Sequence, residues 1–291
     1  MTVLEAIQKS ADFLGKRGVE PSRLNAELLL AHVLKLPRMK LYLNFERALT
    51  ATETDTYRDL VKRRGQREPL QHITGSTSFC GCEIIVSKHA LVPRPETEML
   101  AELGWSFLKE RETQHAGSET GAPTALDFGT GTGCIAIALA VKCPAAQVTA
   151  LDVSAEALAL AKQNATANKV AEKITFVQGD GFAAFDGCPR SFDLIASNPP
   201  YIASAEIATL DPEVRDFDPR AALDGGADGL DFYRRLAREA AAFLKPGGKI
   251  MVEFGDGQAD AIKKIFEDEK WVVEAVKEDY SQRARILVAR R

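Results

Sequence analysis

From Ala125 onward, short apolar segments alternate with helical segments, and this alternation constrains the fold of the 291-residue chain more than any other feature. Continuous apolar strands that alternate with helices are typical of a mostly parallel sheet whose two faces are both covered. Only a short link, residues 280–284, separates the last two strands, so we expect that pair to be antiparallel. The predicted strands lie within residues 124–129, 147–154, 174–180, 192–200, 247–255, 271–279 and 285–290.

The first part of the chain carries helical patterns instead. Thr2 and Glu5 form a capping box ahead of an amphipathic segment. A second segment with apolar side chains at helical spacing stops before Pro37, and a third ends at Gly65. The sequence therefore predicts a small helical domain over residues 1–74.

Between these two parts, the pattern changes from helical to strand-like around Gly81. The change predicts a β-hairpin linker over residues 75–92. A helix is expected over residues 94–111, and the polar residues 112–124 are expected to form a surface loop. The sheet and its helices then make up a second domain, residues 93–291.

Charge and composition limit the classes of partner. Lys and Arg total 37 and Asp and Glu total 41, a formal net charge of -4, so we expect no direct contact with nucleic acid. The N-terminal stretch lacks the basic region and apolar core of a secretion signal, and no apolar run is long enough to span a bilayer. These features predict a cytoplasmic protein without membrane contact. We further expect the chain to act as a monomer.

The five cysteines are an odd number and are scattered, which favours reduced thiols over a disulfide framework. The four histidines form no cluster at ligand spacing. We therefore predict that the chain binds no metal. The cysteines are Cys80, Cys82, Cys134, Cys143 and Cys188.

A glycine-rich turn follows the first strand. Gly129, Gly131 and Gly133 permit a tight turn and a close backbone approach, and the helix that begins at Cys134 offers unpaired N–H groups to a ligand. The turn does not match the dinucleotide fingerprint, because G-x-G-x-x-G requires glycine where Cys134 stands. A nicotinamide-dependent dehydrogenase is therefore disfavoured.

Acidic residues follow the next two strands. Asp152 lies nineteen residues beyond Gly133, where a carboxylate can accept both hydroxyls of a ribose. Asp180 follows the third strand and can reach an adenine amino group, with Phe182 available to cover the ring. Each alone has a structural explanation, since Asp152 can cap a helix and Phe182 can belong to the core. Because ligands of open parallel sheets bind beyond the carboxyl ends of the strands, the three sets together predict an adenosine-containing ligand.

The fourth strand ends in the sequence Asn198-Pro199-Pro200-Tyr201. The prolines fix the backbone path and leave carbonyl groups as acceptors, while Asn198 adds a side-chain oxygen and Tyr201 a flat face. This combination predicts a receptacle for a planar group that bears an NH2. Such a nitrogen is a poor nucleophile because its lone pair is delocalised, and two acceptors would orient it for reaction. A turn that merely ends a strand is the structural alternative.

Two motifs, "DFGTGTG" after the first strand and "NPPY" after the fourth, resemble those of class I S-adenosylmethionine-dependent methyltransferases that modify planar nitrogens. The segments "REPLQHITGSTSFCG", "ALVPRPETEML" and "EVRDFDPRAALDGGADGLDFYRRL" resemble the release factor glutamine methyltransferases, and this likeness extends over nearly the whole chain. It implies a Rossmann-like class I methyltransferase sheet with helices on both faces and an antiparallel last strand, plus a small N-terminal helical bundle. It also implies methyl transfer from S-adenosyl-L-methionine to the glutamine of the Gly-Gly-Gln motif of peptide chain release factors, with S-adenosyl-L-homocysteine as the second product.

The resemblance implies a role for each motif. Asp152 would hold the ribose, the turn from Asp180 to Phe182 the adenine, and the residues of NPPY would bind the substrate glutamine and act in catalysis, with Asn198 also bordering the cofactor. Some members of the family carry a large aromatic side chain directly after the acid of the third strand, where this chain has Gly181. The methionine portion of the cofactor would be lined by Gly129, Thr130, Gly131, Thr132 and Gly133.

Three alternatives stay open at this point. A glutamine methyltransferase that acts on a ribosomal protein would use identical chemistry. Nucleic-acid adenine methyltransferases share NPPY, but they are expected to carry a basic binding surface. A non-catalytic module that docks on translation factors is the third alternative. The segment Pro93–Glu98 either packs over the cofactor cleft or only stiffens the start of a helix, and the helical domain is expected to help recognise the protein substrate.

Overall fold

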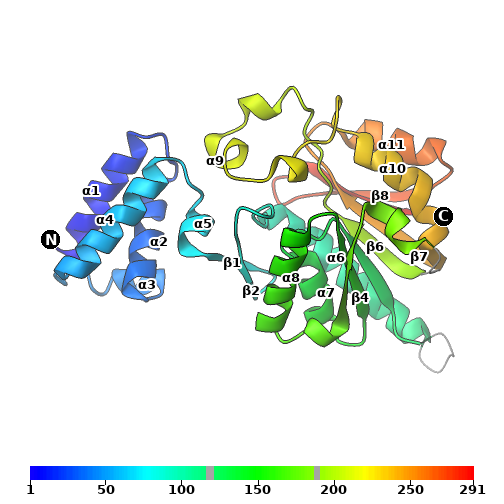
Figure 1. The fold of residues 1–291 in the computed structure, drawn as a ribbon, viewed down its shortest axis with the longest axis horizontal. Helices are drawn as coiled ribbons and strands as arrows, with labels where there is room; N and C mark the ends of the chain where they lie inside the picture. The colour runs from blue at the N-terminus through cyan, green and yellow to red at the C-terminus, as the bar shows by residue number, and fades with distance from the viewer. Residues whose placement is uncertain (116–120, 187–190) are drawn as a thin grey trace. The chain divides into compact units, whose positions relative to one another are not determined.

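Figure 1 shows the fold in a computed structural model, which describes residues 1–115, 121–186 and 191–291. The described chain forms two compact units, each made of two stretches. The helical unit comprises Met1–Ser76 and Leu210–Phe217, and the sheet unit comprises Thr77–Thr209 and Asp218–Arg291. The domain boundaries expected after residues 74 and 92 stay predictions.

The N-terminal stretch of the helical unit confirms the three predicted helices. In the capping box, the Glu5 N–H donates to Thr2 Oγ1 and the Thr2 N–H donates to Glu5 Oε2. Thr50 and Glu53 repeat this exchange at the start of the helix Ala51–Gly65. Two short helices of four and five residues were not predicted, because one turn is too short to show a hydrophobic period. The helices are α1 (Val3–Gly15), α2 (Ser22–Leu34), α3 (Arg38–Leu41), α4 (Ala51–Gly65) and α5 (Leu70–Thr74).

The second stretch of the helical unit contains one short helix, α9 (Pro212–Arg215). Its Glu213 Oε1 accepts hydrogen bonds from Arg64 Nη2 at 2.8 Å and from Arg67 Nε at 2.6 Å. Arg64 is only 6% exposed and also donates to Asn25 Oδ1 and to the Glu68 carbonyl. Removal of one partner of a buried ion pair leaves a charge uncompensated and is destabilising, so the helical unit depends on this distant segment.

The sheet unit contains the predicted sheet, in the order β5-β4-β3-β6-β7-β9-β8. The neighbours from β5 to β7 pair in parallel, and β9 pairs antiparallel with both β7 and β8. The predicted fold class and the antiparallel last pair are therefore confirmed. The strands are β3 (Thr124–Phe128), β4 (Gln147–Asp152), β5 (Ile174–Gln178), β6 (Phe192–Ser197), β7 (Leu244–Glu253), β8 (Val272–Glu278) and β9 (Ala284–Arg290).

Helices cover both faces of this sheet. Side chains alternate along each strand: Leu194 packs into a core with α6 (Pro95–His115), α7 (Cys134–Lys142) and α8 (Ala155–Ala167), whereas Ile195 packs into a core with α10 (Asp231–Glu239) and α11 (Ala259–Asp268). Because both faces are buried, the strands appear in the amino-acid sequence as continuous apolar runs. Short 3-10 turns are η1 (Ala171–Lys173), η2 (Gly181–Phe185), η3 (Ile207–Thr209), η4 (Arg220–Ala222) and η5 (Ala240–Phe243).

The predicted hairpin is present as β1 (Ser76–Phe79) and β2 (Cys82–Ile85), joined at Cys80 and Gly81. Both turn residues have positive φ, 51° and 81°, as a two-residue type I′ turn requires. The loop predicted from residue 112 is wrong at its start, because α6 continues to His115. Residues 112–115 contain no Gly or Pro, so polarity alone does not end the helix. The middle of that loop, residues 116–120, lies outside the described residues.

Four cysteines of the described chain are free, and Cys188 lies outside it. No helix among the described residues is long and apolar enough to cross a membrane. The same residues contain no cluster of three or more His, Cys, Asp or Glu side chains able to hold a metal ion.

Candidate active site

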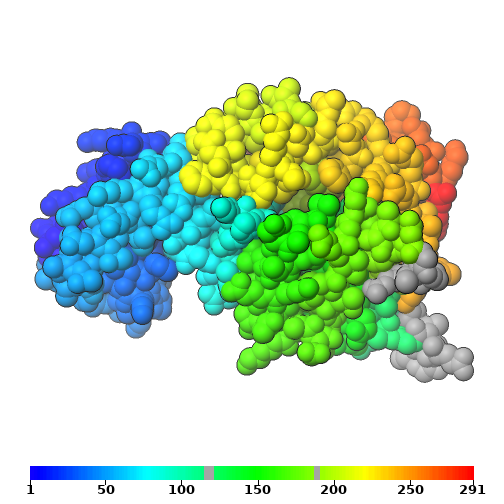
Figure 2. All heavy atoms as spheres, in the orientation of Figure 1, coloured from blue at the N-terminus to red at the C-terminus, as the bar shows by residue number. Residues whose placement is uncertain are grey.

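A cavity of about 250 Å³ lies in the sheet unit where β3, β4, β5 and β6 end. All four strands run in parallel, so their carboxyl ends meet at one edge, where an open α/β sheet binds its ligands. The wall includes segments that follow these strands, together with residues around Pro93 and Pro219. Figure 2 shows the surface hollowed between green atoms that follow β4 and yellow atoms of the segment that follows β6.

The glycine-rich turn between β3 and α7 forms one side of the cavity. Gly129, Gly131 and Gly133 have φ values of 75°, 53° and 82°, a region that side chains other than glycine rarely enter. At Gly133 an added Cβ would also lie 3.0 Å from the Cβ of Ala161 on α8, so this glycine allows α7 and α8 to pack. Of the five predicted residues, Gly133 does not line the cavity, whereas the lining includes Gly129, Thr130, Gly131 and Thr132.

Asp127, which the sequence analysis missed, stabilises the glycine-rich turn through hydrogen bonds of its side chain. Its Oδ2 accepts from Thr130 Oγ1 at 2.6 Å and from the Ala136 N–H at 3.0 Å. The side chain is fully buried, and burial raises the pKa of the carboxyl to about 7. An acidic residue within an apolar strand can be recognised in a sequence. Because buried carboxyl groups are usually hydrogen-bonded, such a residue indicates a side chain that binds nearby backbone.

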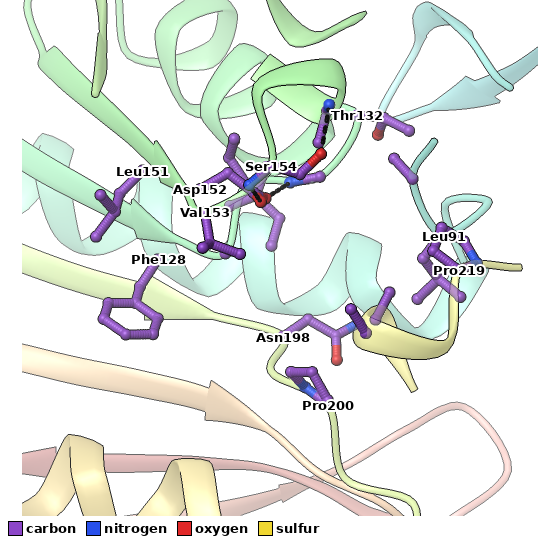
Figure 3. A pocket seen from close by; sticks show the side chains of 18 of the residues that line it. Leu91, Phe128, Thr132, Leu151, Asp152, Val153, Ser154, Asn198, Pro200 and Pro219 are labelled. Atoms are coloured by element: carbon purple, nitrogen blue, oxygen red, sulfur yellow. Dashed lines mark hydrogen bonds between the residues drawn. The ribbon is translucent and has the colours of Figure 1, made fainter. Parts of the chain in front are cut away.

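Asp152 lies at the end of β4 and lines the cavity. Its Oδ2 accepts from the Gly131 N–H and its Oδ1 from the Ser154 N–H, both at 2.9 Å, as the dashed lines in Figure 3 show. The carboxylate therefore connects the glycine turn to the start of α8. The next residue, Val153, also lines the cavity and is 62% exposed, an unusual exposure for a valine.

The turn after β5 differs from expectation. Asp180 and Gly181 line the cavity, but Phe182 does not: it is 2% exposed and its ring stacks on Phe243, with centroids 4.7 Å apart. The flat group at this end is instead the guanidinium of Arg235 on α10, which lines the cavity and bonds to the carboxylate and the carbonyl of Asp180.

Gly181 has a φ of 64°, a region that favours glycine, and a side chain there would also force Arg235 to move. A Cβ there would lie 2.5 Å from Arg235 Nη2 and 2.6 Å from its Cζ. The guanidinium thus occupies the space that a side chain of residue 181 would need. Sequence reasoning missed this residue because the pair lies 54 positions apart and no local pattern connects them.

Asn198 and Pro200 line the cavity across from Asp152, as Figure 3 shows. Asn198 Nδ2 donates to Thr97 Oγ1 at 3.1 Å, and Asn198 Oδ1 is buried without a hydrogen-bond partner in the described chain. Pro199 and Tyr201 are absent from the lining. The Tyr201 ring lies beside Gly255, where an added Cβ would approach it to 3.0 Å, and burial raises the pKa of its phenol.

Each of three residues in the segment Pro93–Glu98 has a defined contact. Arg94 Nη2 donates to Asp218 Oδ2 at 2.8 Å, Thr97 accepts from Asn198, and Glu98 Oε1 accepts from the Cys80 N–H of the hairpin at 2.7 Å. Pro95 is the first residue of α6. The two interpretations of this segment are therefore compatible, because it starts a helix and also supplies part of the cavity wall.

Comparison with known proteins identifies the family of this chain. Residues 5–75 match the family described as PrmC N-terminal domain, and residues 114–211 match the one described as Methyltransferase small domain. The chain is 43% identical over 265 residues to a release factor glutamine methyltransferase of Geobacter sulfurreducens, covering 91% of this chain and 88% of the relative. It is 39% identical over 291 residues to the release factor glutamine methyltransferase of Deinococcus radiodurans, covering 100% and 99%.

Among solved structures, the hMettl16 catalytic domain in complex with MAT2A 3'UTR hairpin 6 is similar with a TM-score of 0.53, covering 82% of this chain and 81% of that one. At 15% sequence identity this likeness shows the fold alone. The sequence relatives show more, because they align over most of both chains at well above 30% identity. The chain belongs to the release factor glutamine methyltransferase family.

Proposed function

We propose that this protein transfers a methyl group from S-adenosyl-L-methionine to the side-chain amide nitrogen of the glutamine in the Gly-Gly-Gln motif of peptide chain release factors. The observation that carries the proposal is the buried Asn198 Oδ1, which has no partner in residues 1–115, 121–186 and 191–291 and lies in the wall of the cavity that Asp152 and the glycine-rich turn also line. A buried acceptor without a partner costs stability, so its retention favours a ligand that donates to it.

The residues present fit the cofactor. Each oxygen of Asp152 accepts one backbone N–H and keeps a further lone pair, which a ribose hydroxyl can use. The residues of the glycine-rich turn would hold the methionine portion, and Asp180, Val153 and Arg235 would surround the base. When bound, S-adenosyl-L-methionine supplies a sulfonium methyl group of high electrophilicity.

In this proposal the protein orients the carboxamide nitrogen of the substrate glutamine, which is a poor nucleophile. Asn198 Oδ1 accepts one N–H of the substrate carboxamide, and a backbone carbonyl of the NPPY sequence accepts the other. This second acceptor is the carbonyl of Pro199 or of Pro200, and of the two residues only Pro200 lines the cavity. The two acceptors hold the NH2 in place and favour the positive charge that develops as nitrogen bonds to the methyl carbon. Nitrogen then releases a proton to water.

We propose that Tyr201 contributes the wall behind Pro200 rather than a hydrogen bond. Its carbonyl accepts from Gln258 Nε2 at 2.9 Å, which fixes the backbone that follows the prolines. The same rigidity holds Asn198 and Pro199, since proline leaves only one free backbone dihedral. Tyr201 does not line the cavity, so the expected contact of its ring with the carboxamide plane stays a prediction.

Mass spectrometry tests the assignment. The protein is incubated with isotope-labelled S-adenosyl-L-methionine and, in parallel, with a release factor, a ribosomal protein and duplex DNA. We expect one added methyl group on the peptide that contains Gly-Gly-Gln. Label on the ribosomal protein or on DNA, with an unmodified release factor, would contradict the proposal and identify one of the alternative substrates.

We further propose that the helical unit contributes to substrate recognition, because a tripeptide loop offers little surface for specificity. Methylation of release factors assigns the protein to the cytoplasm, and we propose that it acts as a monomer without binding nucleic acid. A comparison of intact release factor with a short peptide that carries Gly-Gly-Gln tests the recognition step. Equal kcat/KM for both substrates would contradict a role for any surface beyond the cavity.

A further inference from the structure

Of the two polar atoms of the Asn198 side chain, the nitrogen has a hydrogen-bond partner in the described chain and the oxygen has none. Nδ2 donates to Thr97 Oγ1, whereas the buried Oδ1 lies on the side of Pro200 in Figure 3. An amide presents donors at nitrogen and an acceptor at oxygen, so its orientation decides what the cavity offers to a ligand. A reversed amide would set N–H donors against the NH2 of a substrate carboxamide.

Thr97 has the chemistry to fix this orientation. It lies in the first turn of α6 and is 3% exposed, so water does not compete for its hydroxyl. A hydroxyl carries one hydrogen and two lone pairs, so it can accept from one neighbour only if its own hydrogen is directed elsewhere. The direction of that hydrogen therefore determines which end of the Asn198 amide faces Thr97.

Glu253, at the end of β7, is buried and is the neighbour toward which the Thr97 hydrogen can be directed. Burial raises the pKa of its carboxyl to about 7, and a hydrogen bond with the Thr97 side chain lowers it. A hydrogen bond that lowers the pKa of an acid stabilises the ionised form, and an ionised carboxylate can only accept. An ionised Glu253 that accepts from Thr97 would leave the lone pairs of the hydroxyl for Asn198 Nδ2, which donates to it at 3.1 Å.

We propose that Thr97 is a positioning residue for methyl transfer: it binds the nitrogen of the Asn198 amide and thereby turns the oxygen toward the substrate. This inference rests on the proposed function and adds to it a reason for the threonine in the segment Pro93–Glu98. The other ionisable groups that act on Glu253 are Glu96, Arg94 and Arg285, and the phenols of Tyr201 and Tyr233 lie near it.

Two substitutions of similar size separate the hydroxyl from the packing at this position. Thr97→Val keeps the volume and removes both hydrogen bonds, whereas Thr97→Ser keeps the hydroxyl. We expect Thr97→Val to lower kcat on release factor about tenfold, the effect of one hydrogen bond of ordinary strength. Thr97→Ser should stay close to wild type. The affinity for S-adenosyl-L-homocysteine, measured by calorimetry, should be unchanged in both variants.

A double-mutant cycle with Asn198→Ala distinguishes positioning from general packing. If Thr97 acts through Asn198, Thr97→Val should have no further effect on kcat once the Asn198 side chain is gone. Additive losses, or wild-type turnover in Thr97→Val, would overturn the inference while leaving the proposed function intact. A wild-type protein that leaves release factor unmethylated would overturn both.

Discussion

Asp152 and Asn198 face the same cavity, but the chain treats their oxygen atoms in opposite ways. Both oxygens of Asp152 accept backbone N–H groups of the protein, whereas Asn198 Oδ1 accepts none from the residues that the structure describes. Asp152 therefore shapes the cofactor end before any ligand arrives, and its removal should disturb both binding and folding. The open oxygen of Asn198 forms no hydrogen bond that supports the fold of the described chain, so we expect it to act mainly on turnover.

The largest effect should come from Asn198→Ala. Loss of one preorganised acceptor costs about 3 kcal/mol in the transition state, or about a hundredfold in kcat. Affinity for S-adenosyl-L-homocysteine should be preserved. The thermal midpoint reflects two opposed changes, the loss of the Nδ2 bond to Thr97 and the removal of a buried acceptor that has no partner among the described residues. Turnover is measured by methyl incorporation into release factor. Wild-type turnover with unchanged cofactor affinity would remove Asn198 from the mechanism.

Asp152→Ala should weaken cofactor binding and lower stability, in contrast to Asn198→Ala. We expect cofactor affinity to fall about thirtyfold, since hydrogen bonds to a charged group contribute about 2 kcal/mol. The thermal midpoint should fall as well, because the Gly131 and Ser154 N–H groups lose their partner. Calorimetry and thermal unfolding give the two values. Asp268→Ala, an exposed change of the same charge on α11, is the matched control, and equal behaviour of both variants would contradict the assignment.

The pH dependence of kcat and of stability gives a further comparison of the substrate end of the cavity, at Asn198, with the rest of the site. Below pH 7 Glu253 gains a proton and no longer directs the Thr97 hydroxyl, so kcat should fall by about tenfold in total, the same loss as in Thr97→Val. Stability should change in the other direction. The folded pKa of Glu253 is raised above its ordinary value of 4.5, so its contribution is complete below pH 4.5 and is lost as pH rises through about 7.

Asp127, whose pKa burial also raises to about 7, adds to the same stability trend. An acid-side fall of kcat that coincided with a fall in thermal midpoint would indicate unfolding instead of a change at Asn198. Glu253→Gln provides a second test. Its side-chain oxygen can still accept from Thr97 but does not titrate, so the acid-side fall should disappear. A profile identical to wild type would contradict the role of Glu253.

The smallest effect concerns the base end of the cavity. A guanidinium beside an aromatic ring contributes about 1 kcal/mol, so Arg235→Met should weaken cofactor binding about fivefold. Arg234→Met is the matched control, because Arg234 is the neighbouring residue on α10 and pairs with Asp228 and Asp231 outside the cavity. Equal cofactor affinity of the two variants would show that Arg235 serves only to hold the turn after β5.

The sheet could be predicted from sequence because its signal is local. Seven apolar runs of strand length, with helices between most of them, leave few arrangements, and the short link before Ala284 requires an antiparallel pair. The position of the site followed, since the carboxyl ends of parallel strands share one edge. Glycines with positive φ and the acid at the end of β4 were predictable for the same reason.

The contacts that refine the site were not predictable, because each joins distant residues. Thr97 meets Asn198 across 101 positions, and Arg235 meets Asp180 across 55. Phe182 could equally cover a ligand or fill the core, and only the packing of Phe243 against it shows that it fills the core. Local pattern places a residue on an element, but tertiary packing selects its partner.

The pairing of Glu213 with Arg64 and Arg67 means that the helical unit is not a detachable module. The polypeptide leaves this unit after Ser76, re-enters at Leu210 and departs again after Phe217. A truncation in the hairpin would remove both arginines that pair with Glu213. It would also leave the eight residues Leu210–Phe217 without the rest of their unit. Any exchange of the helical unit between relatives, by engineering or by evolution, would have to graft both stretches together.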